Sequence, residues 1–296
     1  MVSNKRRMSR GGWTLIEVVI VMGIVGLLAA IVTPAVQQVR ITSKRMSCQS
    51  KLRQVGIAMH SFHEGNNGFP STTQSWEELL PGLDQAALYD RIKSQNYDQM
   101  TKVPVYRCDM DVKNITVVGV NVSLNDGLGF QNFGYDGMEQ TSPALVSLGD
   151  VTDGTSQTAH VSERLFPFGL DRMAWFTLTS HRGASEIDQF AKACRGQRLS
   201  PVYPGVTYAD SSGCILTSAR SGYNAVLGPN SPSCFNGPPS DPDSTSARHQ
   251  ALSASSLHPN GVNVLMVDGA VRFVADGIDI KVWRAMSSRN GNDTAE

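Results

Sequence analysis

The longest apolar stretch of the chain lies close to its start. Residues 18–32 contain no polar side chain. Counted from Trp13, a helix through this stretch has about 20 residues and a length of ~30 Å, which is the thickness of the hydrocarbon core of a bilayer. The pattern therefore predicts a helix that can span a membrane.

A second, amphipathic pattern continues the same helix. Beyond Pro34, apolar residues recur at steps of four and three and form a stripe on one face: Cys48, Leu52, Val55, Met59 and Phe62. The motif Gly65-Asn66-Asn67-Gly68 favours an end to the helix, because these residues tolerate positive φ. We predict one helix over roughly residues 13–63, with its first half in lipid and its second half packed on a globular domain.

The following segments predict short helices and strands. A capping box at Ser75-Trp76-Glu77-Glu78 starts a short helix that Pro81 ends, and a second short helix is expected over 84–92. Runs rich in β-branched and aromatic residues, separated by Gly and Asp-Gly turns, predict antiparallel strands at 115–122, 144–148, 157–162 and 173–179.

The last third of the chain contains a long aperiodic segment and then a hairpin. Residues 190–250 are rich in Gly, Pro, Ser and Cys, which predicts a long loop that is pinned by disulfides or exposed as a functional surface. Residues 262–267 and 270–275 flank Asp268-Gly269, a pattern typical of a β-hairpin with a type I′ turn. A short closing helix is expected over 278–286.

The start of the apolar helix carries a specific motif. Gly12-Trp13-Thr14-Leu15-Ile16-Glu17 resembles the prepilin-type cleavage and methylation motif, with Trp13 in place of the usual Phe. The resemblance implies that Gly12 ends a leader peptide (1–12), that Trp13 becomes the N-methylated terminus, and that Glu17 pairs with the terminal amine of a neighbouring subunit. It further implies a transmembrane segment at 13–36 and an exported globular domain at 37–296.

An ordinary secretory signal is the competing interpretation of the same residues. Lys5, Arg6, Arg7 and Arg10 would form its basic region. However, the apolar region of such a signal usually has about 7–15 residues, and a Glu is not expected at its start. The prepilin-type interpretation is therefore favoured.

A wider resemblance covers most of the chain. His258, nine residues and then Asp268-Gly269 resemble the C-terminal signature of a planctomycete-enriched bacterial domain of unknown function that usually follows a prepilin-type N-terminus. Matching segments lie at 48–70, 76–90, 153–163 and 229–234. The resemblance implies an α+β, pilin-like fold: a long N-terminal helix against an antiparallel β-sheet, with a long Cys/Gly-rich loop and a C-terminal β-hairpin.

Charge and cysteine content limit the possible partners. The 26 basic and 26 acidic residues cancel, so no net field attracts nucleic acid. Both flanks of the apolar stretch are basic, so the charges do not decide the orientation of the helix. A cytoplasmic N-terminus and a periplasmic or surface-exposed domain are expected from the motif alone.

None of the five cysteines forms a C-x-x-C pair, and an exported domain allows up to two disulfides among Cys48, Cys108, Cys194, Cys214 and Cys234. Connectivity stays open, although Cys48 falls on the buried stripe, where Cys108 is one possible partner.

No residue pattern indicates an enzyme, a cofactor or a metal site. His258 and Asp268 are separated by about nine residues of strand, or ~30 Å, which favours structural roles as a capping imidazole and a turn residue. The pair His60 and His63 and the loop carboxylates Asp150 and Asp153 are weak metal signals. Nucleophile-elbow, Walker and dinucleotide fingerprints are missing from the sequence.

Two functions remain. The favoured one is a pseudopilin or minor-pilin-like structural subunit of a type II secretion or type IV pilus-like assembly, single-pass in the inner membrane. Its expected partners are that membrane, prepilin peptidase and other pilin-like subunits, and no nucleic acid. The alternative is a membrane-anchored module in which residues 190–250 bind a carbohydrate or envelope polymer.

Overall fold

The computed structural model describes residues 14–70, 76–94, 103–110, 121–128, 136–138, 145–165, 174–176, 184–195, 222–236 and 250–291. The chain divides into two units, Met1–Ser43 and Lys44–Glu296. The longest helix, α1 (Leu15–Asn66), has residues in both units and contains Pro34. Its bounds agree with the helix expected over roughly 13–63, except that Trp13 itself lies outside the described residues.

The first unit consists of the apolar part of α1. Within the described residues, α1 is the one helix long and apolar enough to cross a membrane. Within the described residues its apolar side chains are exposed: Leu15, Leu27 and Val39 are 83%, 65% and 67% exposed. A single apolar helix of this kind is compatible with a single-pass membrane anchor.

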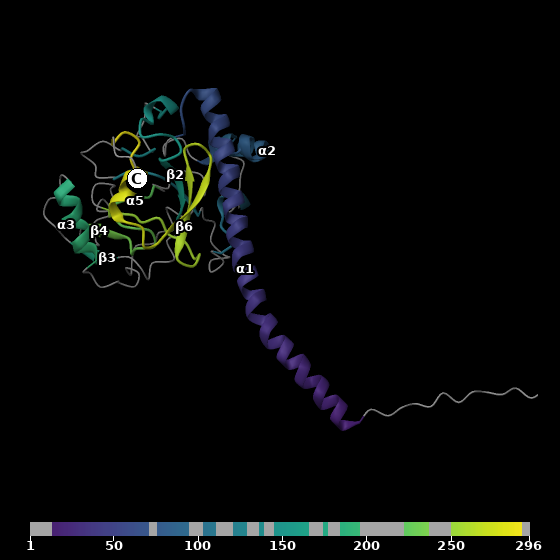
Figure 1. Ribbon diagram of the computed structural model, residues 1–296. Helices are drawn as coiled ribbons and strands as arrows, with labels where there is room; N and C mark the ends of the chain where they lie inside the picture. Colours follow the sequence, from purple (N-terminus) through teal and green to yellow (C-terminus); the bar gives the residue numbers. More distant parts are fainter. Residues whose placement is uncertain are drawn as a thin grey trace, which may run out of the picture. The chain divides into compact units, whose positions relative to one another are not determined.

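The second unit contains a four-stranded sheet in the order β1-β2-β6-β7. The two central strands, β2 and β6, are labelled in Figure 1. Its strands are β1 (Val122–Leu124), β2 (Ala159–Glu163), β6 (Gly261–Met266) and β7 (Val271–Ala275). Every neighbouring pair is antiparallel. The predicted α+β class, with a long helix against an antiparallel sheet, is therefore confirmed and is consistent with a pilin-like fold.

Strand β6 is buried on both faces because its side chains alternate between two cores. Leu265 belongs to the core that includes Val55 and Met59 of α1. The backbone of α1 comes close to the sheet at Gly56, where an added Cβ would lie 2.9 Å from Cδ1 of Leu265. The packed half of α1 therefore covers one face of the sheet, as the apolar stripe predicts.

Helix α5 (Ile280–Ser287) packs on the other face of the sheet. Val264 of β6 shares a core with Trp283 of α5, whose side chain is fully buried. The Trp283 indole Nε1 donates to the carbonyl of Leu227 at 3.1 Å, so the polar atom of this buried ring is satisfied. Residues 278–286 were expected to form a closing helix, and α5 is that helix.

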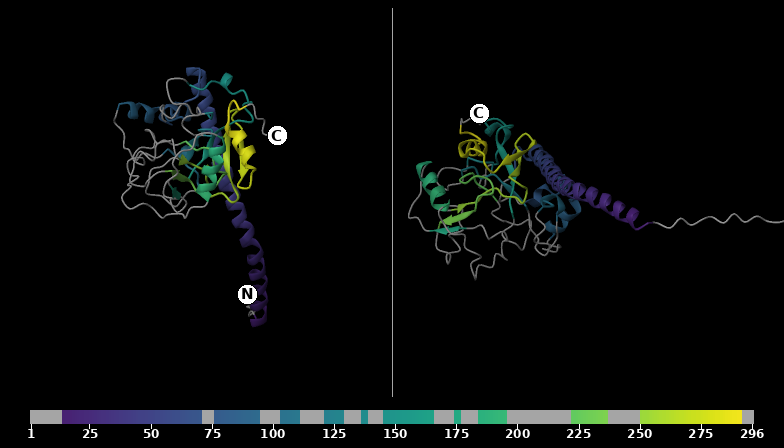
Figure 2. Two further views of the ribbon diagram at one scale, coloured as in Figure 1. Left: turned by 90° about the vertical axis from the view of Figure 1, so that its left-hand side faces the viewer. Right: turned by 60° about the horizontal axis from the view of Figure 1, so that its bottom comes forward.

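A second, three-stranded sheet lies beside helix α3 (Ala184–Arg195) (Figure 2). Its order is β3-β4-β5, from β3 (Ala174–Phe176), β4 (Cys234–Asn236) and β5 (Gln250–Ala251). Part of α3 falls in the segment 190–250, which was expected to have no regular structure, and this expectation is wrong for 190–195 and for β4. Helix α3 forms because Ile187, Phe190 and Cys194 make one apolar face. The Gly- and Ser-rich residues on either side of the helix weaken the helical periodicity in the sequence, so this face was not detected.

The remaining short elements differ in part from the prediction. The capping-box segment forms short 3₁₀ helices at Trp76–Leu79 and Pro81–Leu83, and helix α2 spans Ala86–Lys93. The strand expected at 144–148 is wrong, because Ser147 and Asp150 form a capping box on a 3₁₀ helix at Leu148–Asp150. Most of the strand expected at 115–122 lies outside the described residues.

The β6–β7 hairpin is present, but its turn is not type I′. That turn needs positive φ at both central residues, and of Asp268 and Gly269 only Gly269 has it, at 87°. The Met266 N–H donates to the Ala270 carbonyl at 2.8 Å, and the Gly269 N–H donates to the Met266 carbonyl at 3.0 Å. The connection is therefore a three-residue loop with glycine in the left-handed position.

Candidate functional site

Glu17 caps the start of α1 in this chain. Its Oε2 atom accepts hydrogen bonds from the backbone N–H and the hydroxyl of Thr14, both at 2.8 Å. The Thr14 hydroxyl in turn accepts from the Glu17 N–H at 3.4 Å, which completes a capping box. Gly12 and Trp13, the expected processing residues, lie outside the described residues.

The packed half of α1 is fastened to the globular domain by covalent and polar contacts. A disulfide joins Cys48 of α1 to Cys108, with a Cα–Cα distance of 5.0 Å. Asp109, next to Cys108, accepts two further hydrogen bonds from α1. Lys51 Nζ, one turn after Cys48, donates to Oδ1 at 2.6 Å, and the hydroxyl of Ser47, which precedes Cys48, donates to Oδ2 at the same distance. These contacts fix the helix on the loop that holds Cys108 and Asp109.

A buried polar network lies directly beneath this attachment. Gln49 of α1 donates from Nε2 to Oδ1 of Asn263 in β6 at 3.0 Å. The Asn263 backbone N–H donates to Oε2 of Glu163 at 2.9 Å, and its Nδ2 donates to Oε1 at 3.0 Å. Both oxygens of the Glu163 carboxylate are therefore held in place by one asparagine of the neighbouring strand.

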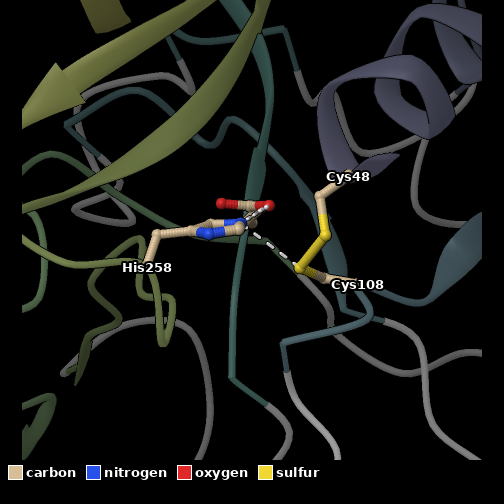
Figure 3. A group of neighbouring side chains, drawn as sticks. Cys48, Cys108 and His258 are labelled. Atoms are coloured by element: carbon tan, nitrogen blue, oxygen red, sulfur yellow. Dashed lines mark hydrogen bonds and ion pairs between the residues drawn. A yellow bond between two sulfur atoms is a disulfide. The ribbon is translucent and has the colours of Figure 1, made fainter. Parts of the chain in front are cut away.

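His258 completes the network and reaches the disulfide. Its Nε2 lies 3.1 Å from Oε1 of Glu163 and 3.3 Å from Sγ of Cys108. Figure 3 shows the imidazole ring pointing toward the bond between Cys48 and Cys108. The side chains of His258 and Glu163 are only 0% and 3% exposed. Nε2 is therefore the ring nitrogen that faces both the Glu163 carboxylate and the disulfide.

The structure separates the two residues of the C-terminal signature. His258 was expected to be a capping imidazole, and this expectation is wrong, because its ring binds Glu163 at the far end of strand β2. Asp268 is a turn residue as expected, since its Oδ1 accepts from the Ala270 N–H at 2.9 Å. Gly269 supplies the positive φ of the same turn.

Three other histidines surround one phenylalanine. The rings of His60, His63 and His160 lie 5.5, 4.7 and 4.6 Å from the Phe69 ring centroid. His60 Nε2 lies 2.9 Å from the carbonyl of Val267, and His63 Nε2 accepts from a backbone N–H. Burial, together with the neighbouring His60 and His63, lowers the pKa of His160 to about 3. These three histidines, including the His60 and His63 pair considered from its spacing, form an aromatic cluster around Phe69.

The loop carboxylates considered as calcium ligands are engaged in the protein. Asp150 Oδ2 accepts from the backbone and the hydroxyl of Ser147, and these bonds lower the pKa of its carboxyl group. Asp153 Oδ2 accepts from the Ser288 hydroxyl at 3.2 Å and from the Gly291 N–H at 2.8 Å. Both side chains thus have structural roles in this loop.

The remaining cysteines fall into two groups. Cys194 of α3 and Cys234 of β4 form a second disulfide inside an apolar cluster. Cys214 lies outside the described residues, as does most of the 190–250 segment to which a ligand-binding surface was assigned.

Sequence reasoning placed Glu163 in the family-matching segment 153–163 without giving it a role, and it did not single out Asn263 or Gln49. The available signal for Glu163 was that family match, and the structure shows that it ends a strand whose five residues are all buried. No comparable signal marks Asn263 or Gln49, because an amide is common on strands and helices.

Comparisons with known proteins match the chain to one protein family and to one curated protein. Residues 37–281 match the model of a family described as "Protein of unknown function (DUF1559)". The chain is also 32% identical over 75 residues to the type II secretion system core protein G of Pseudomonas aeruginosa, a stretch that is 25% of this chain and 53% of that protein. The chain thus spans about half the length of this curated relative. No solved structure matches the chain.

Proposed function

Because the chain belongs to the DUF1559 family of proteins of unknown function and is similar to a secretion core protein, we propose that it is a pilin-like structural subunit. In this proposal the chain is anchored in the inner membrane and assembles with other pilin-like subunits of a type II secretion or type IV pilus-like machine. Its role is structural and not catalytic. The observation that carries the proposal is the uncovered apolar part of α1, continuous with a half that is fastened to a folded domain.

The physical argument rests on where those apolar side chains can go. Leaving a Leu, Ile or Val side chain in water costs roughly 1.5–3 kcal/mol relative to burying it. The part of α1 from Leu15 to Val39 exposes more than a dozen such residues, so it requires lipid or the apolar faces of other helices. A subunit that leaves the bilayer must therefore exchange lipid for neighbouring subunits, which favours a helical bundle.

Glu17 supplies a polar contact within this apolar surface. Oε2 is used by Thr14, whereas Oε1 has no partner among the described residues. A carboxylate in an apolar environment favours a cationic partner. In the proposed assembly that partner is the N-terminal amine of a neighbouring subunit, created when a prepilin peptidase cuts after Gly12. The pair fixes the axial register between helices.

Mass spectrometry of the native N-terminus tests the processing step. We expect a chain that begins at N-methylated Trp13 and fractionates with the inner membrane. A soluble chain that begins beyond residue 30 would contradict the proposal, because the apolar helix would then be a discarded secretory signal.

Substitution of Glu17 tests the assembly step. Glu17→Ala should leave membrane insertion and cleavage intact and reduce recovery in assembled complexes by about 10- to 150-fold, the equivalent of the 1.5–3 kcal/mol typical of a hydrogen bond to a charged group. The matched control is Glu64→Ala, which removes an exposed carboxylate from the other end of α1.

A further variant separates capping from pairing. Thr14→Ala removes the side chain that binds Glu17 but keeps the carboxylate, so we expect assembly close to that of the wild type. An equal defect in Thr14→Ala and Glu17→Ala would show that Glu17 acts only on its own helix.

A further inference from the structure

We propose that the chain holds one Zn²⁺ ion when the disulfide beside α1 is reduced, on four side chains: Cys48, Cys108, Glu163 and His258. One ligand atom from each of these residues lies within 4.8 Å of the others. Two thiolates, an imidazole and a carboxylate are ligands that tetrahedral zinc accepts. The inference concerns the buried network alone and does not depend on the proposed assembly.

The distances already approach those of a zinc site. Bonds of about 2.0–2.3 Å from zinc to N, O and S place tetrahedral ligand atoms roughly 3.3–3.8 Å apart. The Nε2 atom of His258 lies 3.1 Å from Glu163 Oε1 and 3.3 Å from Cys108 Sγ. The main change required is separation of the two sulfur atoms, which follows once their bond is broken.

The surroundings of the site hold the ligands in place. Asn263 fixes both oxygens of Glu163, and Gln49 fixes the amide of Asn263. Hydrogen bonds of this kind, from residues behind the ligands, orient the ligands of natural metal sites. The Cys194–Cys234 disulfide lies instead in an apolar cluster, so it serves as an internal comparison.

The proposed conversion balances in electrons and protons. A dithiol reductant donates two electrons and two protons to the Cys48–Cys108 disulfide, which yields two thiols and the disulfide of the reductant. Zinc then displaces both thiol protons into water and binds the neutral imidazole through Nε2, with the imidazole proton on Nδ1. The ion would tie α1 to the Cys108 loop, as the disulfide does, and through Glu163 it would also tie α1 to strand β2.

The test uses the full-length chain in detergent. A variant with Cys194→Ser, Cys214→Ser and Cys234→Ser leaves only the two proposed thiol ligands. After reduction and removal of the reductant, Co²⁺ is added as a spectroscopic probe. We expect one Co²⁺ per chain with a thiolate-to-cobalt charge-transfer band, displacement by one equivalent of Zn²⁺, and no binding to the oxidised protein.

Ligand variants distinguish this site from adventitious binding. Glu163→Gln and His258→Ala should each weaken Co²⁺ binding at least about tenfold. The matched control keeps Cys194 and Cys234 but carries Cys48→Ser and Cys108→Ser, and it should show no charge-transfer band. Absence of the band in the reduced three-serine variant, or a Co²⁺ affinity in either ligand variant equal to that of the three-serine variant, would overturn the proposal.

A second measurement uses the chain without any substitution. In the reduced wild-type chain, Zn²⁺ should protect Cys48 and Cys108 from alkylation at least tenfold more than it protects Cys194 and Cys234, as mapped by mass spectrometry. Equal alkylation with and without Zn²⁺ would refute the site.

Discussion

His160 provides a sharp test of the packing between α1 and the sheet. The residue is 1% exposed, its ring meets Phe69 edge-on, and its Nε2 has no hydrogen-bond partner among the described residues. His60 and His63 face it from α1, and their charge also opposes its protonation. Protonating this imidazole therefore requires the packed half of α1 to loosen or the chain to unfold.

The magnitude follows from the pKa difference between the folded and unfolded states. The pKa falls from an ordinary 6.5 to about 3 in the folded chain. The unfolded state then binds more protons between these values, so the free energy of unfolding decreases as pH falls below 6.5. At 1.36 kcal/mol per pKa unit, the full loss is about 5 kcal/mol, of which about 3 kcal/mol is reached at pH 4.

The assay compares the wild type with His160→Leu, which has no titrating group at this position. Denaturant unfolding of the full-length chain in detergent is followed by tryptophan fluorescence from pH 7 to pH 4. Other acid-sensitive groups affect both proteins, so the difference isolates His160. We expect the wild type to lose about 3 kcal/mol more than the variant over this range. Equal pH dependence would refute the burial of a neutral imidazole at this contact.

Two further predictions concern the attachment of α1. Gly56→Val should destabilise the domain by roughly 1–3 kcal/mol, because the new side chain overlaps Leu265. At Gly65 an added Cβ meets nothing within 4 Å, so Gly65→Ala should be neutral or stabilising by up to about 1 kcal/mol. Thermal and denaturant unfolding measure both, and equal effects would contradict the close approach of helix and sheet. Replacing Cys48 and Cys108 by alanine should cost about 4 kcal/mol, because their sequence separation of 60 residues closes a long loop in the unfolded chain. Removing the other disulfide, which has a separation of 40 residues, should cost only a few tenths less, and a difference above ~2 kcal/mol would contradict the loop-entropy account.

Local patterns predicted the elements that depend on local interactions. The apolar run and the stripe through Leu52 and Met59 identify α1, and alternation about Asp268-Gly269 identifies the β6–β7 hairpin. The turn type was not predictable from the dipeptide, because the same residues fit a two-residue or a three-residue connection and strand register decides between them.

The buried network was not predictable because its members are far apart in the sequence. His258 and Glu163 are separated by 95 residues and meet only because antiparallel strand β2 ends where β6 begins. The strand length between His258 and Asp268 shows that these two residues are far apart, but it does not show which residues of the next strand they contact. Helix α3 had a detectable apolar face, but the Gly- and Ser-rich residues around it diluted the periodicity.

Photo-crosslinking in intact native cells tests the central claim most directly. A photoreactive amino acid replaces Val19, a 58% exposed residue of the apolar part of α1. The account predicts crosslinked products whose second component is another copy of the chain or another pilin-like subunit, identified by mass spectrometry, and loss of those products in the Glu17→Ala background. Crosslinks to lipid alone, with the chain otherwise monomeric, would contradict the proposal that these helices bundle.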